Sequence, residues 1–307
     1  MNKRIFIKTP LRTPGGKSKA LPKLLEHITT FEEYRENFLG GGSMFLRLAQ
    51  LYPDKIYWIN DLQYATYAVW NTIYNNSEQM IQFILEQKNK YKNENEGRML
   101  HTYCRKEIDI VDKKDEFLTA CYLYILNKTS FSGLSRIGSY APQAFTSNFT
   151  IKCINNLKNV SNIMHSVKSL KITNLDYSKL LVNDENTFIF CDPPYDIKHN
   201  LYGNDGDMHR GFNHKKFSDD IKNCKSKWMI TYNDNPTIKE WFSEYQCIPW
   251  NLQYTMQSAK RTSHGNLVSE REKISGKEIT TFQQVKSKNA KSDKSGKIGQ
   301  ELLILNY

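Results

Sequence analysis

The chain has 307 residues, 39% of them hydrophobic, which suffices for a substantial core and for two domains. Its 43 lysines and arginines against 32 acidic residues give a net charge of +11, typical of proteins that bind a polyanion, although an ordinary solvated surface would also explain it. The six cysteines contain no C-x-x-C pair, which argues against a zinc ribbon or a disulfide framework, and no apolar run suits a signal peptide or a membrane span. These features predict a cytoplasmic protein without a membrane partner.

The first 64 residues have the pattern of one βαβ unit. A helix is expected from Ser18 to Ile28, after a rigid N-terminal loop. A strand-like stretch then leads into Gly40-Gly41-Gly42, and Ser43 is the expected N-cap of the following helix. The apolar run at 55–60 predicts the second strand, which ends at Asp61.

Residues 65–166 change to long, polar-rich helices with intervening loops, which indicates a helical domain inserted into the first. Strands are expected again at three places, residues 170–176, 187–191 and 227–232. Between the last two, Asn213 is the expected N-cap of a helix, with Phe212 and Phe217 as its hydrophobic staple. The overall class is therefore α/β.

The C-terminal part combines a polar stretch with a final strand. Residues 257–297 are poor in apolar side chains and carry many lysines, which predicts a basic, mobile loop suited to contacts with phosphates. The apolar run at 301–307 predicts a strand that pairs with another near 247–254. The main domain is then discontinuous and comprises residues 1–64, 167–256 and 298–307.

Asp192-Pro193-Pro194-Tyr195 directly follows the apolar run 187–191. Ligands bind at the carboxyl ends of strands in open α/β sheets. Prolines lack an N–H, so the neighbouring carbonyls are available as acceptors. An acid, these carbonyls and an aromatic ring suit a flat base that carries an exocyclic amino group. A strand followed by a simple proline turn is the alternative interpretation.

The glycine triplet and the acid at the end of the next strand point to a nucleoside. Glycines let the backbone approach a ligand, and an acid at the position of Asp61 binds ribose hydroxyls. Residues 40–45 do not match the G-x-G-x-x-G pattern, so a ligand without pyrophosphate, such as S-adenosylmethionine, fits better. Residues 15–18 read Gly-Gly-Lys-Ser, but Leu11 occupies the place of the first glycine of a phosphate loop.

In this order the motifs resemble the DNA adenine-N6 methyltransferases of the Dam type, the D12 class in the α arrangement. The matching segments are 11–17, 38–43, 60–61, 127–136, 176–177, 192–195, 231–234 and 301–304. The resemblance implies a Rossmann-like fold that uses S-adenosylmethionine, with residues 65–166 as a target-recognition domain. It also implies action on double-stranded DNA, alone or beside a cognate restriction endonuclease.

The resemblance assigns roles at the site. The cofactor would contact Thr13, Lys17, Phe38, Gly40, Gly41, Gly42, Asp61, Asp176 and Asp192. Asp61 would bind its ribose and Asp176 its adenine, whereas Thr13 replaces a Trp or Tyr of the relatives and cannot stack. The catalytic residues would be Asp192, Pro193, Pro194 and Tyr195. The Asp192 carboxylate and Pro193 carbonyl would accept the amino group of an adenine flipped onto Tyr195, and no metal is required.

The same resemblance assigns DNA contacts to Arg12, Asn127, Ser132 and Arg136, since arginine paired with guanine is the commonest specific contact. A structural role for such loop residues is the alternative. The loop 137–143 is shorter than the hairpin of GATC-specific relatives, so that specificity is not expected to transfer. The loop 196–211 is expected to close over the flipped base. An RNA or protein amino-methyltransferase and an inactive DNA-binding module remain as alternative functions.

Overall fold

The computed structural model describes residues 6–195, 211–253, 270–274, 277–281 and 298–307. The chain divides into two compact units, one made of residues 1–252 with 299–307 and the other of 253–298. Among the described residues, no helix combines the length and the apolar character needed to cross a membrane. The loop expected to cover the base lies, at 196–210, outside the described residues.

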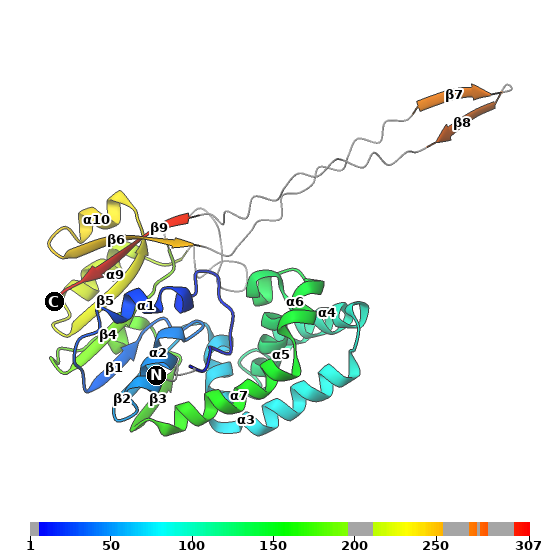
Figure 1. Cartoon of the computed structure of the whole chain (residues 1–307). Helices are drawn as coiled ribbons and strands as arrows, with labels where there is room; N and C mark the ends of the chain where they lie inside the picture. Colours follow the sequence, from blue (N-terminus) through cyan, green and yellow to red (C-terminus); the bar gives the residue numbers. More distant parts are fainter. Residues whose placement is uncertain (1–5, 196–210, 254–269, 275–276, 282–297) are drawn as a thin grey trace, which may run out of the picture. The chain divides into compact units, whose positions relative to one another are not determined.

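A seven-stranded sheet with the order β3-β2-β1-β4-β5-β9-β6 organises the first unit (Figure 1). Its strands are β1 (Glu33–Glu36), β2 (Ile56–Asn60), β3 (Ser169–Thr173), β4 (Thr187–Cys191), β5 (Lys227–Asn233), β6 (Gln246–Gln253) and β9 (Ile298–Leu305). Neighbouring strands pair in parallel along the part of the sheet ordered β3-β2-β1-β4-β5, and β9 pairs antiparallel with β5. Strand β1 pairs with β2 on one side and with β4 on the other. The strand order therefore reverses direction at β1, and the carboxyl ends of β1 and β4 flank the crevice where such sheets bind ligands.

Strand β4 is buried along its whole length, as expected for a central parallel strand covered on both faces. On one face, the ring of Phe188 stacks on Tyr34 of β1 with 6.3 Å between the ring centroids. On the other, Ile189 lies in a hydrophobic cluster with Phe217 of helix α9 (His214–Lys222). This burial fixes β4 and therefore the residues that follow it.

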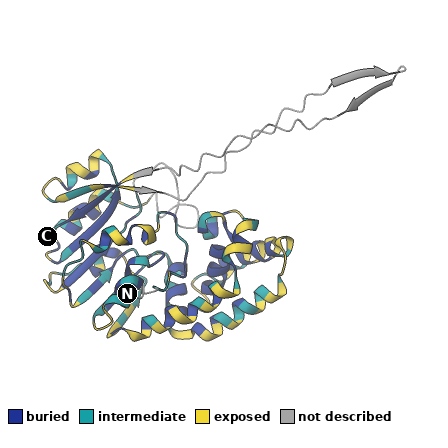
Figure 2. Ribbon diagram, viewed as in Figure 1, coloured by how far each residue is buried: buried dark blue, intermediate teal, exposed yellow. Residues whose placement is uncertain are grey.

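Five helices lie between β2 and β3, in the interval where the sequence predicts an insertion. They are α3 (Tyr64–Lys90), α4 (Glu94–Val111), α5 (Glu116–Thr129), α6 (Pro142–Asn148) and α7 (Ile151–Ser166). Helix α5 is buried from Thr119 to Thr129 and packs against α3 and α4 (Figure 2). The 3₁₀ turns η2 (Phe131–Gly133) and η3 (Ser135–Ile137) follow it. These helices belong to the same compact unit as the sheet.

The prediction of one helix from Ser18 to Ile28 is wrong in its extent. A 3₁₀ turn, η1 (Lys17–Lys19), precedes a separate short helix, α1 (Leu21–Leu25). Pro22 lies in the first turn of α1. Proline lacks the N–H that would continue the preceding turn, but it is well accommodated where a helix begins.

One predicted N-cap is wrong and another is confirmed. In helix α2 (Ser43–Leu51) the N-cap is Gly42 at φ 62°, a left-handed conformation that favours glycine, and Ser43 is the first helical residue. In α9, the side chain of Asn213 accepts a hydrogen bond from the third N–H of the helix. The rings of Phe212 and Phe217 lie 5.7 Å apart, which confirms the hydrophobic staple.

The C-terminal strand pairs as expected. Helix α10 (Pro236–Trp241) connects β5 to β6, and β9 then lies between these two strands in the sheet. The second unit contains an antiparallel hairpin of β7 (Glu270–Ile274) and β8 (Lys277–Thr281). This hairpin lies within the stretch predicted as a mobile basic loop, and the remaining residues of 257–297 lie outside the described part of the chain.

Candidate functional site

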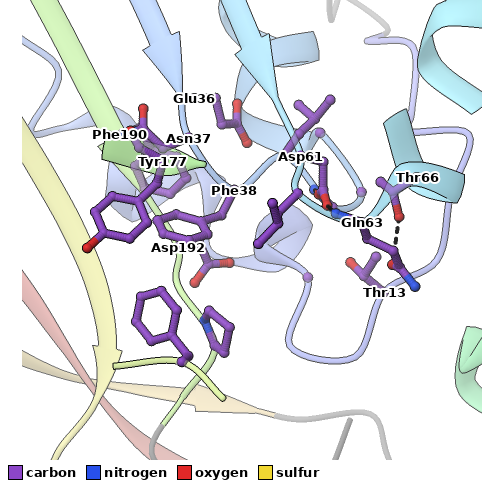
Figure 3. Close-up of a pocket in the computed structure, with 18 of the residues that line it drawn as sticks. Thr13, Glu36, Asn37, Phe38, Asp61, Gln63, Thr66, Tyr177, Phe190 and Asp192 are labelled. Carbon is purple, nitrogen blue, oxygen red and sulfur yellow. Dashed lines mark hydrogen bonds between the residues drawn. The ribbon is translucent and has the colours of Figure 1, made fainter. Parts of the chain in front are cut away.

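A cavity of about 430 Å³ opens at the carboxyl ends of β1, β2 and β4 (Figure 3). Its volume is within the usual range for a small-molecule or cofactor site. All nine residues that the resemblance assigned to a cofactor line it, namely Thr13, Lys17, Phe38, Gly40, Gly41, Gly42, Asp61, Asp176 and Asp192. Segments far apart in the sequence therefore meet at one site, as the resemblance implies.

The glycine loop after β1 is in close contact with its surroundings. Gly42 adopts a left-handed conformation, and a Cβ there would lie 2.4 Å from the ring of Trp70 in α3. A Cβ on Gly41 would lie 2.9 Å from Oγ1 of Thr13. The indole Nε1 of Trp70 also donates a 3.0 Å hydrogen bond to the Gly40 carbonyl. Side chains at these positions would push the loop away from both neighbours.

Asp61 holds the glycine loop from the end of β2. Its Oδ2 accepts a 2.7 Å hydrogen bond from the N–H of Gly40, and its Oδ1 accepts a 2.9 Å bond from the N–H of Gln63. Burial raises the pKa of Asp61 to about 6, although these two N–H groups lower it in part. Each carboxylate oxygen keeps a further lone pair for a ligand hydroxyl.

Glu36, the last residue of β1, also lines the cavity, although no sequence motif pointed to it. Its Oε2 accepts a 2.7 Å hydrogen bond from the hydroxyl of Tyr34 and a 2.8 Å bond from the N–H of Phe45 in the first turn of α2. Burial raises the pKa of Glu36 to about 8. A glutamate in phase with the buried Tyr34 is the signal in the sequence that could have revealed it.

Aromatic rings form one wall of the cavity. Phe38 stacks on Tyr177 with 5.6 Å between centroids, and Phe212 meets the edge of Phe38 at the same distance. The hydroxyl of Tyr177 donates a 2.7 Å hydrogen bond to Asp220 of α9. Asp176 is exposed and is the N-cap of the turn η4 (Tyr177–Leu180). This wall presents a flat apolar surface with a carboxylate beside it.

The carboxylate of Asp192 receives donors from two distant parts of the chain. Nζ of Lys17 lies 2.7 Å from Oδ1 and 2.8 Å from Oδ2. The hydroxyl of Thr231 in β5 donates a 2.7 Å hydrogen bond to Oδ1. Lys17 is only 3% exposed and also donates to the Gly15 carbonyl at 2.9 Å. These contacts hold the carboxylate in one orientation at the wall of the cavity.

The other residues of the 192–195 motif lie beside this carboxylate. Pro194 lines the cavity, and Pro193 is buried. The ring of Tyr195 stacks on Tyr232 of β5 at 6.1 Å, and Nζ of Lys17 lies 4.9 Å from its centroid. Tyr195 therefore already lies against one aromatic ring next to Asp192.

The residues predicted to contact DNA are brought together, but two of them bond to the protein itself. The Asn127 amide is 2% exposed and accepts from the Arg12 N–H at 3.0 Å. Arg136 is 6% exposed and forms an ion pair with Asp112 at 3.0 Å. Ser132 is half-buried at φ 51° in η2. The structure thus gives Asn127 and Arg136 the structural contacts that the alternative interpretation of these loop residues expects.

Comparison with known proteins places these features in a family. Residues 14–256 match the family model described as D12 class N6 adenine-specific DNA methyltransferase. The chain is 26% identical over 202 residues to the Type II methyltransferase M.MjaIII of Methanocaldococcus jannaschii, covering 62% of this chain and 69% of that protein. It is 26% identical over 248 residues to the Type II methyltransferase M.CviBI of Paramecium bursaria Chlorella virus NC1A, covering 78% and 88%. It is 23% identical over 265 residues to the Type II methyltransferase M1.LlaDCHI of Lactococcus lactis subsp. cremoris, covering 82% and 90%.

Proposed function

Because this chain belongs to the D12 class of N6 adenine-specific DNA methyltransferases, we propose that its cavity binds S-adenosylmethionine beside the target adenine. The chain is a site-specific enzyme that methylates the N6 amino group of adenine in DNA. The observation that carries the proposal is the position of Asp192. Asp192 directly follows the central strand β4 and lines the cavity, so this one residue would border both reactants.

The chemistry of the cavity lining fits this cofactor. A hydroxyl-bearing ribose would bind the Asp61 carboxylate, and its adenine would stack on the Phe38 wall near Asp176. Lys17 and the glycine loop would contact the remaining part of the molecule, and a backbone contact at Thr13 would replace stacking. When bound, S-adenosylmethionine supplies an activated methyl group on a sulfonium. The protein's role is to hold that group in line with the target nitrogen.

The target adenine would bind at the 192–195 motif. Its amino lone pair is delocalised into the ring and is a poor nucleophile. Hydrogen bonds from the amino group to the Asp192 carboxylate and the Pro193 carbonyl favour a tetrahedral nitrogen and offset the positive charge that develops during transfer. The base must leave the duplex to reach this position, and Tyr195 would stack on it.

We assign target recognition to the helical insertion, residues 65–166, and the catalytic site to the sheet. The net charge of +11 favours a polyanion, and we propose that the substrate is double-stranded DNA. We propose that the enzyme acts in the cytoplasm, alone or beside a cognate restriction endonuclease; its relatives are Type II methyltransferases. Arg12 and Ser132 remain candidates for DNA contact, whereas Asn127 and Arg136 are buried in protein contacts.

The test replaces Asp192 by alanine. Asp192→Ala should abolish methyl transfer to DNA while calorimetry still detects binding of S-adenosylhomocysteine. Asp219→Ala is the matched control, because Asp219 also pairs with a lysine, at 2.5 Å, but on the exposed face of α9. Wild-type turnover by Asp192→Ala would refute the catalytic assignment. Failure of the wild-type protein to bind S-adenosylhomocysteine would refute the cofactor site.

A further inference from the structure

Residues 9–17, here called the 9–17 loop, lie against the glycine loop of the cavity. The hydroxyl of Thr9 donates a hydrogen bond to the carbonyl of Gly41. Thr13 leaves no room for a side chain at Gly41, as its Oγ1 would lie 2.9 Å from a Cβ there. Thr13, Pro14 and Lys17 line the cavity directly. A shift of the 9–17 loop would therefore change the shape of the cavity.

The opposite side of the 9–17 loop is bonded to the segment 127–136. Oδ1 of Asn127 accepts a 3.0 Å hydrogen bond from the N–H of Arg12, and its Nδ2 donates a 2.7 Å bond to the carbonyl of the same residue. Nδ2 carries two hydrogens, so its other N–H is shared between the Gly133 carbonyl at 3.0 Å and Oγ of Ser135 at 3.2 Å. A single buried amide thus joins the two segments.

The orientation of this amide is determined by its partners. A backbone N–H only donates and a carbonyl only accepts, so the Asn127 oxygen must face the N–H of Arg12. The contact is also tight, because Gly133 has φ 73° and a Cβ on it would lie 2.4 Å from the Arg12 carbonyl oxygen. Asn127 could read a base only by breaking bonds that are already satisfied.

A smaller cavity of about 50 Å³ links the same two segments. Thr13, Pro14, Gln63 and Thr66 line both this cavity and the large one, and Asn127 and Arg136 line its other side. The 9–17 loop is therefore the shared wall between the cofactor cavity and the segment 127–136.

We propose that Asn127 is a positioning residue that couples cofactor binding to DNA binding through the 9–17 loop. The inference rests on the proposed function, in which the large cavity takes the cofactor and the helical insertion meets DNA. A ligand that orders either segment orders the other through the amide, so each ligand raises the affinity for the other. Linkage requires that the two effects be equal in size.

The test compares the affinity for S-adenosylhomocysteine, measured by calorimetry, without and with a saturating short duplex. The duplex carries the methylated motif that sequencing finds in DNA from cells expressing the protein. In the wild type the duplex should tighten binding about fivefold or more, as is usual for coupled sites. In Asn127→Leu, which keeps the volume of the side chain but removes every hydrogen bond of the amide, this factor should fall toward one.

Gln50→Leu is the matched control. The Gln50 amide makes the same pair of bonds to the backbone of Ile7, accepting at 2.8 Å and donating at 3.2 Å, but from helix α2. The substitution Gln50→Leu removes an equivalent pair of bonds to the N-terminal segment but does not affect residues 127–136. The coupling factor should therefore remain that of the wild type. Equal factors in Asn127→Leu and the wild type would overturn the proposal, as would a factor of one in the wild type.

A second measurement covers the case in which Asn127→Leu does not fold. In the wild-type protein, S-adenosylhomocysteine alone should slow amide hydrogen exchange in peptides spanning 127–136. Unchanged exchange there, together with protection of the glycine loop, would overturn the coupling while leaving the cofactor site intact. No binding at all would instead refute the proposed function, so the two failures are distinguishable.

Discussion

The hydroxyl of Thr231 donates a 2.7 Å hydrogen bond to Oδ1 of Asp192 across neighbouring strands. Thr231 is fully buried and follows Ile230, which pairs in register with Cys191 of β4. Its backbone is held on the other side by pairing with Leu303 of β9. Strand β9 therefore helps to fix the orientation of the Asp192 carboxylate, which follows β4, by holding Thr231 in place.

This relationship predicts a rate effect at Thr231. Thr231→Val keeps the shape of the side chain and should lower kcat by about tenfold to a hundredfold, as expected for loss of a hydrogen bond to a charged group. Thr231→Ser retains the hydroxyl and should restore most of the rate. Steady-state kinetics should show KM for both substrates nearly unchanged. An equal loss in the serine variant would mean that packing rather than the hydrogen bond matters.

The ion pair of Lys17 with Asp192 predicts a stability effect. Lys17→Met should lower the free energy of unfolding by about 2 kcal/mol, because it leaves a partly buried carboxylate without its cation. Adding Asp192→Asn should restore part of this loss, since the uncompensated charge is then gone. Urea unfolding of the two single variants and the double variant measures this coupling. Strict additivity of the two losses would contradict it.

The raised pKa of Asp61 predicts pH-dependent cofactor binding. Burial raises this pKa to about 6, and ribose hydroxyls would donate to the ionised carboxylate. Affinity for S-adenosylhomocysteine should therefore be constant well above pH 6 and weaken as the pH falls through 6. Asp61→Asn should bind more weakly and show no such decline. Calorimetry between pH 5 and 8 distinguishes these outcomes, and a flat wild-type profile would exclude Asp61 as the acceptor.

Glu36 predicts that the protein loses stability as the pH rises. Its folded-state pKa is about 8, above its ordinary value of 4.5, because burial disfavours the charged form. The fold therefore favours the protonated acid, and its contribution to stability is lost as the pH rises toward 8. The contribution of Glu36 to Tm should fall from about pH 4.5 to about pH 8 and then level off. Glu36→Gln cannot ionise, so the Tm of the variant minus that of the wild type should rise over that interval; a constant difference would contradict this prediction.

Residues that line the cavity could be singled out in the sequence because they follow strand ends or lie in glycine-rich turns. Gly40, Asp61 and Asp192 are placed by local signals, namely an apolar run followed by a turn or an acid. The contacts of Glu36 and Thr231 were missed because they depend on which strands and helices become neighbours. No local pattern shows that Thr231 lies beside Asp192.

The DNA-contact residues show a second limit. Asn127 and Arg136 lie in a motif typical of base readers, yet α5 packing buries the first and an acid at the end of α4 pairs with the second. Burial of a polar side chain depends on the helices around it, which the motif does not specify. Ser43 failed as an N-cap for a local reason, because Gly42 adopts the left-handed conformation immediately before the helix.

The most direct test of the central claim is modification-sensitive long-read sequencing of DNA from cells that express the protein. Wild-type protein should leave N6-methyladenine at one recurrent sequence motif, and cells expressing Asp192→Ala at the same level should lack it. Absence of methylated adenine with the wild type, or an identical pattern with Asp192→Ala, would contradict the account.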